Sequence, residues 1–116
     1  IPISDCGTPD GGWTEGESYY LESDIGPPPG FEACLRISTN NITLNCRNKK
    51  ITTTRSNGVE IENANNVSVS NCKILTPGSV GIEVIGSNNT LQNNEIEAYT
   101  GILIRAGSEN ILVNNE

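Results

Sequence analysis

Short runs of alternating apolar and polar residues recur along the chain, and each run is framed by asparagine or glycine. The stretch NNVSVSNCKI at 65–74 has this form, and NNTLQNNEI at 88–96 and NILVNNE at 110–116 carry nearly the same text. Alternation with a period of two predicts strands with one buried face, although asparagine is disfavoured inside strands. The pattern therefore predicts a repeat of short strands with asparagine at the corners.

Three strands can be aligned from one repeat to the next. The first strands, spaced by 24, 23 and 20 residues, are Cys34–Ile37, Gly58–Ile61, Gly81–Val84 and Gly101–Ile104. The second strands are centred on Leu44, Val69, Leu91 and Val113, and the third strands of the first three repeats on Ile51, Ile74 and Ile96. Repeats of this length predict a parallel solenoid, in which each coil hydrogen-bonds to the coils above and below it.

The asparagines have a structural explanation in such a solenoid. Asparagine tolerates the left-handed backbone conformation of a sharp corner, and stacked asparagine side chains can bond to one another along the axis. We expect Asn71, Asn93 and Asn115 to form one such ladder after the second strand. The alternative, that the asparagines bind a sugar, is weaker because the corners already explain their spacing.

The repeats CLRISTNNITLNC, GVEIENANNVSVSNCKI and GIEVIGSNNTLQNNEI resemble those of right-handed parallel β-helix proteins, the pectin-lyase-like fold. YYLESDI, ahead of NITLNC, is similar to the opening of secreted and surface β-helix proteins of archaea. The resemblance covers Tyr19 to Glu116 and implies an all-β, single-stranded right-handed parallel β-helix (β-solenoid) of about four to five coils, with three short strands per coil. This fold carries lyases, hydrolases, tail spikes, adhesins and structural proteins, so it implies no single function.

One domain is expected, because the chain has 116 residues and 34% hydrophobic content. We expect an irregular entry and cap segment over residues 1–33 and β-helix coils over residues 34–116. The aromatic residues of the entry segment are expected to cover the end of the first coil; they are Trp13, Tyr19, Tyr20 and Phe31.

Charge and composition exclude several classes of partner. The net charge is −7, and the basic cluster RNKK at 47–50 is the largest one, so nucleic acid and anionic lipid are not expected as partners. No apolar run reaches the roughly 20 residues that a membrane helix needs. The sequence opens on Ile1 and contains no methionine, which favours an extracellular or cell-surface chain whose signal peptide has been removed.

The four cysteines predict two disulfides. They lack C-x-x-C spacing and the chain has no histidine, so an oxidising compartment fits better than a zinc site, and we expect no metal or cofactor. In the β-helix register Cys46 lies one place from Cys72 on the next coil, within disulfide reach at a coil spacing of about 4.8 Å. Cys6 then pairs with Cys34.

Three N-x-S/T sequons occur, at Asn41, Asn66 and Asn88. Their number is what this asparagine- and serine-rich composition gives by chance. Their common position, just before the second strand of each repeat, is more informative, because it predicts acceptor sites for glycans at one corner of the solenoid.

Enzyme chemistry is not expected. Lyases of this fold hold calcium with clustered aspartates, but the aspartates here all lie in the entry segment, at Asp5, Asp10 and Asp24. Glu60 and Glu83 should be outward neighbours about 5 Å apart, near the separation of retaining glycosidases. Arg36 should stack beside Glu60 on a solvated face, which favours a surface charge pair; an incidental cation between the glutamates is the alternative.

The last repeat predicts an assembly surface. Its third strand would lie near position 118, so we expect an exposed β edge and an open apolar core. Ile1–Ser4 could supply the missing strand of a neighbouring copy, with Pro2 placed where no N–H is needed. The expected assembly residues are Ile1, Pro2, Ile3, Ile111, Val113 and Asn115.

These features favour a non-enzymatic extracellular structural protein, which stacks head to tail with other copies of itself into a filament or surface fibre. The alternative is a cell-surface carbohydrate-binding or adhesin module, or a fragment of a larger β-helix protein, which would also end within a coil. A polysaccharide lyase or hydrolase is the least favoured function.

Overall fold

The computed structural model describes residues 1–9, 11–27 and 33–116, and the regular structure in these ranges is all β. Its strands pair in parallel throughout. Their bounds are β1 Pro2–Ile3, β2 Ser18–Leu21, β3 Leu35–Ile37, β4 Thr43–Asn45, β5 Lys50–Thr52, β6 Val59–Glu62, β7 Ser68–Ser70, β8 Lys73–Ile85, β9 Thr90–Gln92, β10 Glu95–Ala106 and β11 Ile111–Val113.

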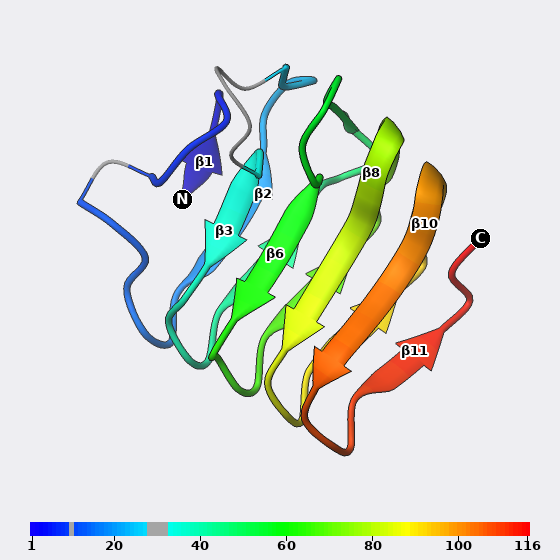
Figure 1. Ribbon diagram of the computed structural model, residues 1–116. Coiled ribbons are helices and arrows are strands. Elements are labelled where there is room, and N and C mark those ends of the chain that lie inside the picture. Colours follow the sequence, from blue (N-terminus) through cyan, green and yellow to red (C-terminus); the bar gives the residue numbers. More distant parts are fainter. Residues whose placement is uncertain (10, 28–32) are drawn as a thin grey trace.

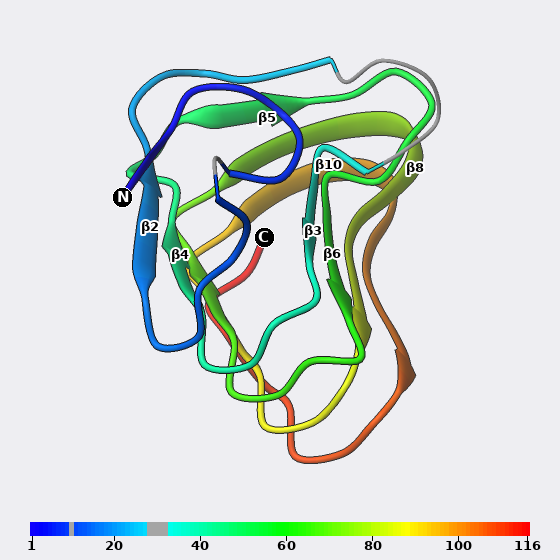
Figure 2. The same ribbon diagram turned by 90° about the vertical axis from the view of Figure 1, so that its left-hand side faces the viewer.

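The strands form two stacks that enclose a common interior. One sheet has the order β1-β2-β4-β7-β9-β11, and the other has the order β10-β8-β6-β3 with β5 beside β8. The N-terminus and β1 lie at one end of the stack and β11 and the C-terminus at the other (Figure 1), while the view along the stack shows the coils winding around the interior (Figure 2). The predicted all-β parallel solenoid is confirmed.

The corner between the third strand of one coil and the first strand of the next is not a turn in the later coils. β8 and β10 are single elements of 13 and 12 residues that serve as both strands. They bend without breaking because they remain paired with each other along nearly their whole length. The sequence predicts two short strands here because Gly78, Gly81 and Gly101 indicate corners.

The predicted register is confirmed for the first and third strands. In the first strand, Leu35 pairs with Val59, Val59 with Ile82, and Ile82 with Ile102. The corresponding columns, Ile51–Ile74–Ile96 in the third strand and Leu44–Val69–Leu91 in the second, are also in register. These inward side chains are almost fully buried in the middle coils and form the core.

The last second strand differs from the prediction by one residue. Leu112, not Val113, pairs with the buried Leu91, and Val113 pairs with the exposed Gln92 and points outward. A bulge at Arg105 adds one residue relative to the preceding coil, which is why Leu112 and not Ile111 stands over Leu91. Because β11 has three apolar residues in a row, alternation alone does not identify the inward one.

The corner ladder shifts with it. The left-handed residues after the second strand are Asn71, Asn93 and Asn114, with φ angles of 56°, 56° and 52°. Asn115 is therefore not the third member of that ladder. It lies one residue further along the chain, where its side chain forms hydrogen bonds with the preceding coil.

The paired sheet extends into the predicted entry segment. β2 pairs in register with β4, and Ile25 forms a bridge with Ile51. β1 pairs with β2 in the same chain and buries Ile3. The boundary at residue 33 therefore marks the start of the regular repeats and not the start of the sheet, and the Ile1–Ser4 strand already has an intramolecular partner.

The entry segment covers the free edge of β3. Cys6 is disulfide-bonded to Cys34, and the Gly7 N–H donates to the Cys34 carbonyl at 2.7 Å. The Trp13 indole Nε1–H donates to the Arg36 carbonyl at 2.7 Å, and its ring meets the buried Tyr19 edge to face. The predicted aromatic cap is thus present for these two residues; Phe31 lies outside the described residues.

Candidate functional site

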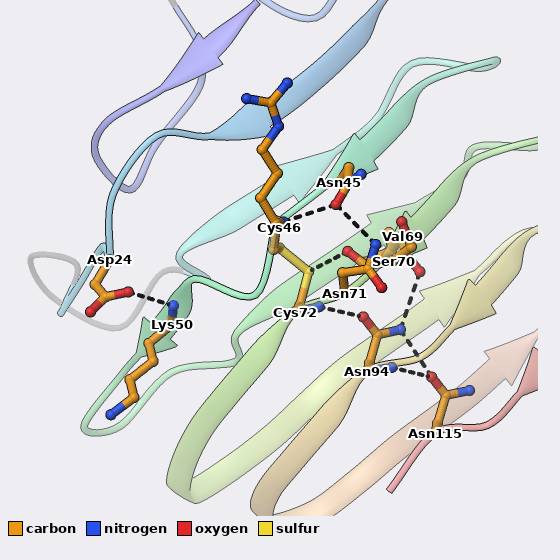
Figure 3. Close-up of a disulfide and its surroundings, with 11 residues drawn as sticks. Asp24, Asn45, Cys46, Lys50, Val69, Ser70, Asn71, Cys72, Asn94 and Asn115 are labelled. Carbon is orange, nitrogen blue, oxygen red and sulfur yellow. Dashed lines mark hydrogen bonds between the residues drawn. A yellow bond between two sulfur atoms is a disulfide. The ribbon is translucent and has the colours of Figure 1, made fainter.

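Buried asparagines join successive coils at the corner after the second strand. Asn94 accepts a hydrogen bond from the Cys72 N–H at 3.0 Å and donates one to the Val69 carbonyl at 3.1 Å, both on the preceding coil (Figure 3). Asn115 repeats this on the next coil, where it accepts from the Asn94 N–H at 3.2 Å and donates to the Leu91 carbonyl at 2.9 Å. One side chain thus satisfies two backbone groups at each corner.

The corner before the second strand carries the same arrangement. Asn89 accepts from the Val67 N–H at 2.8 Å and donates to the Ala64 carbonyl at 3.1 Å. Asn110 does the same for the Asn89 N–H and the Gly86 carbonyl, each at 3.0 Å. We call these four side chains the corner clamps; they are Asn89, Asn94, Asn110 and Asn115.

The corner clamps give the stack a direction. Each clamp reaches from its own coil to the preceding one, so the last coil closes the corners of its neighbour. Within the described residues, the backbone N–H groups of Asn110 and Asn115 have no hydrogen-bond acceptor. These two N–H groups occupy the positions at which the earlier coils accept a corner clamp from the next coil.

A disulfide takes the place of the clamp earlier in the chain. Cys46 and Cys72 are bonded, with their Cα atoms 4.7 Å apart, and Cys72 lies at the corner that Asn94 occupies one coil later (Figure 3). Beside it, the Asn71 amide donates to the Asn45 side-chain oxygen at 3.1 Å. Both predicted cysteine pairs, Cys46–Cys72 and Cys6–Cys34, are confirmed.

The predicted column of charged residues is present on the outer face of the first strands. Arg36 and Glu60 pair at 3.0 Å, and Glu60 lies beside Glu83 on the next coil. The Asn57 amide donates to both glutamates, at 2.8 Å and 3.1 Å, and Arg105 lies 3.6 Å from Glu83. Each carboxylate is already engaged by a cation and an amide, as expected for a surface network.

No clustered metal-ligand set accompanies these glutamates. Among residues 1–9, 11–27 and 33–116, the structure groups no three histidine, cysteine, aspartate or glutamate side chains in an arrangement that could hold a metal ion. Two of the aspartates, Asp5 and Asp24, lie in the entry segment, where Asp24 accepts a hydrogen bond from the Lys50 N–H at 2.8 Å; Asp10 is outside the described residues.

Apolar side chains are exposed over the last coil. Leu112 and Ile104 point inward, yet they are 44% and 40% exposed, because within the described residues no layer covers them. Tyr99, on β10, is 86% exposed. We call the surface formed by β10 and β11 the open end.

Outward positions also become apolar at the open end. Glu83, Thr90 and Gln92 are followed in their columns by Leu103, Ile111 and Val113, respectively. In a parallel stack the outward side chains of successive layers lie one over another, so a further layer would shield part of these residues. These three exposed residues extend the apolar surface of the open end beyond its inward side chains.

A model of the right-handed β-helix region matches residues 33–116, which is more than two thirds of the chain. The chain belongs to the right-handed β-helix family. No curated protein and no solved structure matches this β-helix. In the described part of the chain, no helix is long and apolar enough to cross a membrane. The family includes enzymes and non-enzymes, so the function of this β-helix rests on its own residues.

The corner clamps and the inward position of Leu112 were not predicted from the sequence. A signal for the clamps exists, because an asparagine pair with the same spacing occurs at Asn89 and Asn94 and again at Asn110 and Asn115. In the pairs Asn88–Asn89 and Asn93–Asn94 the second asparagine is the buried one. Of the predicted assembly residues, Ile111, Val113 and Asn115 lie at the open end, whereas Ile1, Pro2 and Ile3 lie at the opposite end of the stack.

Proposed function

We propose that this β-helix is a non-enzymatic structural protein of the extracellular space or cell surface, whose copies stack head to tail into a filament. The observation that carries the proposal is the apolar surface of the open end, which includes the outward residues Leu103, Ile111 and Val113. A contiguous apolar surface of this kind is typical of a protein–protein contact. The partner proposed is a second copy of this chain.

The two ends of the stack are complementary. β1 and β11 are the two edges of one six-stranded sheet, and all pairings in that sheet are parallel. When the β1 edge of one copy is placed against the β11 edge of another, the sheet therefore continues with all of its strands parallel. Such a contact is heterologous, and repeated without closure it generates a filament.

The strand from Ile1 to Ser4 takes part without leaving its own chain. It is paired with β2 and buries Ile3, so its release would expose apolar surface. We therefore place β1 as the receiving edge of the next subunit, and not as a strand donated to the third-strand position. This modifies the strand addition expected from the sequence.

A structural role also agrees with the chemistry of the faces. Glu60 and Glu83, the acidic pair nearest to a catalytic arrangement, are bridged by Asn57 and paired with arginines. The two disulfides favour an oxidising compartment, which supports an extracellular location. Nucleic acid and membrane lipid are not proposed as partners of this acidic chain.

The proposal is tested by light scattering over a concentration series of the purified 116-residue protein with its disulfides intact. Association into long assemblies predicts a weight-average mass that rises with concentration, far above the 12.4 kDa of one chain. A constant mass of one chain at every concentration would contradict the proposal and favour a monomeric surface-binding module.

Glycans are proposed on the corner that bears the sequons. Asn41, Asn66 and Asn88 are exposed and share left-handed φ angles of 59°, 58° and 59°. The Asn41 amide donates to the Glu15 carboxylate at 3.0 Å, which opposes its modification. After expression through a glycosylating secretory pathway, we expect peptide mass spectrometry to show higher occupancy at Asn66 and Asn88 than at Asn41. The Glu15→Ala variant should raise occupancy at Asn41, and unchanged occupancy would contradict this explanation.

A further inference from the structure

We infer that subunits join with Ile3 of one copy directly over Leu112 of the preceding copy, and that Pro2 selects this register. The inference rests on the proposed head-to-tail stacking and specifies its hydrogen bonds. It follows from which backbone groups each edge strand leaves free.

The C-terminal edge offers the backbone of Leu112. The Ile111 N–H donates to the Asn89 carbonyl at 2.8 Å, and the Val113 carbonyl accepts from the Asn93 N–H at 3.0 Å, so both residues are directed toward β9. Successive residues of a strand direct their N–H and C=O groups to opposite sides. The N–H and C=O of Leu112 therefore face away from the molecule at the open end.

The N-terminal edge offers the backbone of Pro2 and Ser4. The carbonyls of Ile1 and Ile3 accept hydrogen bonds from the N–H groups of Tyr20 in β2 and Glu22 just after it, at 3.0 Å and 3.2 Å. Pro2 and Ser4 alternate with them and face the free edge. Pro2 presents a carbonyl there but lacks an N–H, whereas Ser4 presents both groups.

The rule for joining layers is visible within the chain. In each parallel step, the carbonyl of an inward residue accepts an N–H from the residue that follows its partner on the next coil, as Val67 does from Thr90 and Ile3 from Glu22. By this rule, the Leu112 carbonyl accepts the N–H of the residue that follows its partner. In a parallel pair the Leu112 N–H then donates to the carbonyl of the residue that precedes its partner.

Two registers place an inward residue over Leu112, and Pro2 distinguishes them. With Ile1 over Leu112, the Leu112 carbonyl would need the N–H that Pro2 lacks. With Ile3 over Leu112, the Leu112 N–H donates to the Pro2 carbonyl and the Leu112 carbonyl accepts the Ser4 N–H. A slip by one residue would turn the inward face of β1 outward and is excluded for that reason.

This register also covers exposed apolar surface. Pro2 then lies over Ile111 and Ser4 over Val113, while Ile3 lies over Leu112. Ile111 is 55% exposed in the single chain, and the ring of Pro2 would shield it. The proline thus permits the pairing of β1 with another copy in one register only, which is a restriction expected of an edge strand.

Cysteine cross-linking tests the register. In the Ser4→Cys/Val113→Cys variant, the two outward residues are opposed, so mild oxidation of assembled protein should give a ladder of covalent oligomers on non-reducing gels. The matched control Ser4→Cys/Ile111→Cys, offset by two residues, should give much less. Filaments without preferential cross-linking of the first variant would refute the register and leave the filament intact, whereas absence of any assembly would refute both.

A second measurement applies to the unmodified chain and does not depend on the cysteines. Filaments mixed from subunits with labelled isoleucine and subunits with labelled leucine should show an intermolecular solid-state NMR contact between Ile3 and Leu112. A contact between Ile1 and Leu112 in its place would overturn the inference.

Discussion

Replacing Asn94 with leucine should lower the free energy of unfolding by about 3–5 kcal/mol, the largest effect expected of a single side chain in the stack. The substitution keeps the approximate volume but leaves the Cys72 N–H without an acceptor and removes the side-chain donor to the Val69 carbonyl. Asn94 is 1% exposed, so water does not replace the lost hydrogen bonds. Urea denaturation followed by circular dichroism, at concentrations where the protein is monomeric, measures the change.

Gln92→Leu is the matched control, because Gln92 is exposed and lies at the end of β9, two residues before Asn94. It adds the same apolar side chain without leaving a buried group unpaired, so a change within about 0.5 kcal/mol is expected. Equal effects of the two substitutions would show that the corner clamps do not stabilise the stack.

Leu112→Lys should abolish assembly while the subunit remains folded. In the proposed filament this side chain is buried between two copies, and an ammonium group there would lie in an apolar contact without a partner. In the single chain Leu112 is 44% exposed, so the lysine can reach water and the fold tolerates it. Sedimentation velocity should change from long assemblies to a single species of one chain.

Thr43→Lys provides the control for charge. Thr43 is exposed on the outer face of β4, a strand that lies away from both ends of the stack. Its replacement by lysine changes the net charge by the same amount. Assembly should persist in this variant. Loss of assembly in both variants would show that net charge, and not the open end, controls association.

The sequence predicted the columns of the β-helix where only one residue of each strand was a candidate for the interior. Leu35, Val59 and Ile82 are separated by polar neighbours, so alternation placed them correctly. At β11, three consecutive apolar residues left the inward position undetermined, and the predicted Val113 is one residue beyond the inward Leu112. Alternation fails where the outward face is itself apolar.

The candidate site was predictable only in part for the same reason. The Cys46–Cys72 disulfide follows from the coil register, because cysteines on neighbouring coils are close enough to bond, and Cys6–Cys34 is then the remaining pair. The corner clamps did not, since Asn93 and Asn94 are the same residue type while one forms the exposed turn and the other is buried. The pairing of β1 with β2 of the same chain was not predicted, because a strand of two residues carries no periodic signal.

The central claim, that the open end binds the N-terminal edge of another copy, is tested most directly by electron microscopy of the unmodified protein. Six stacked strands at about 4.8 Å per layer predict unbranched filaments with an axial repeat of about 29 Å per subunit. Dispersed single particles at concentrations well above the light-scattering range, or filaments whose subunits alternate in direction, would contradict the claim.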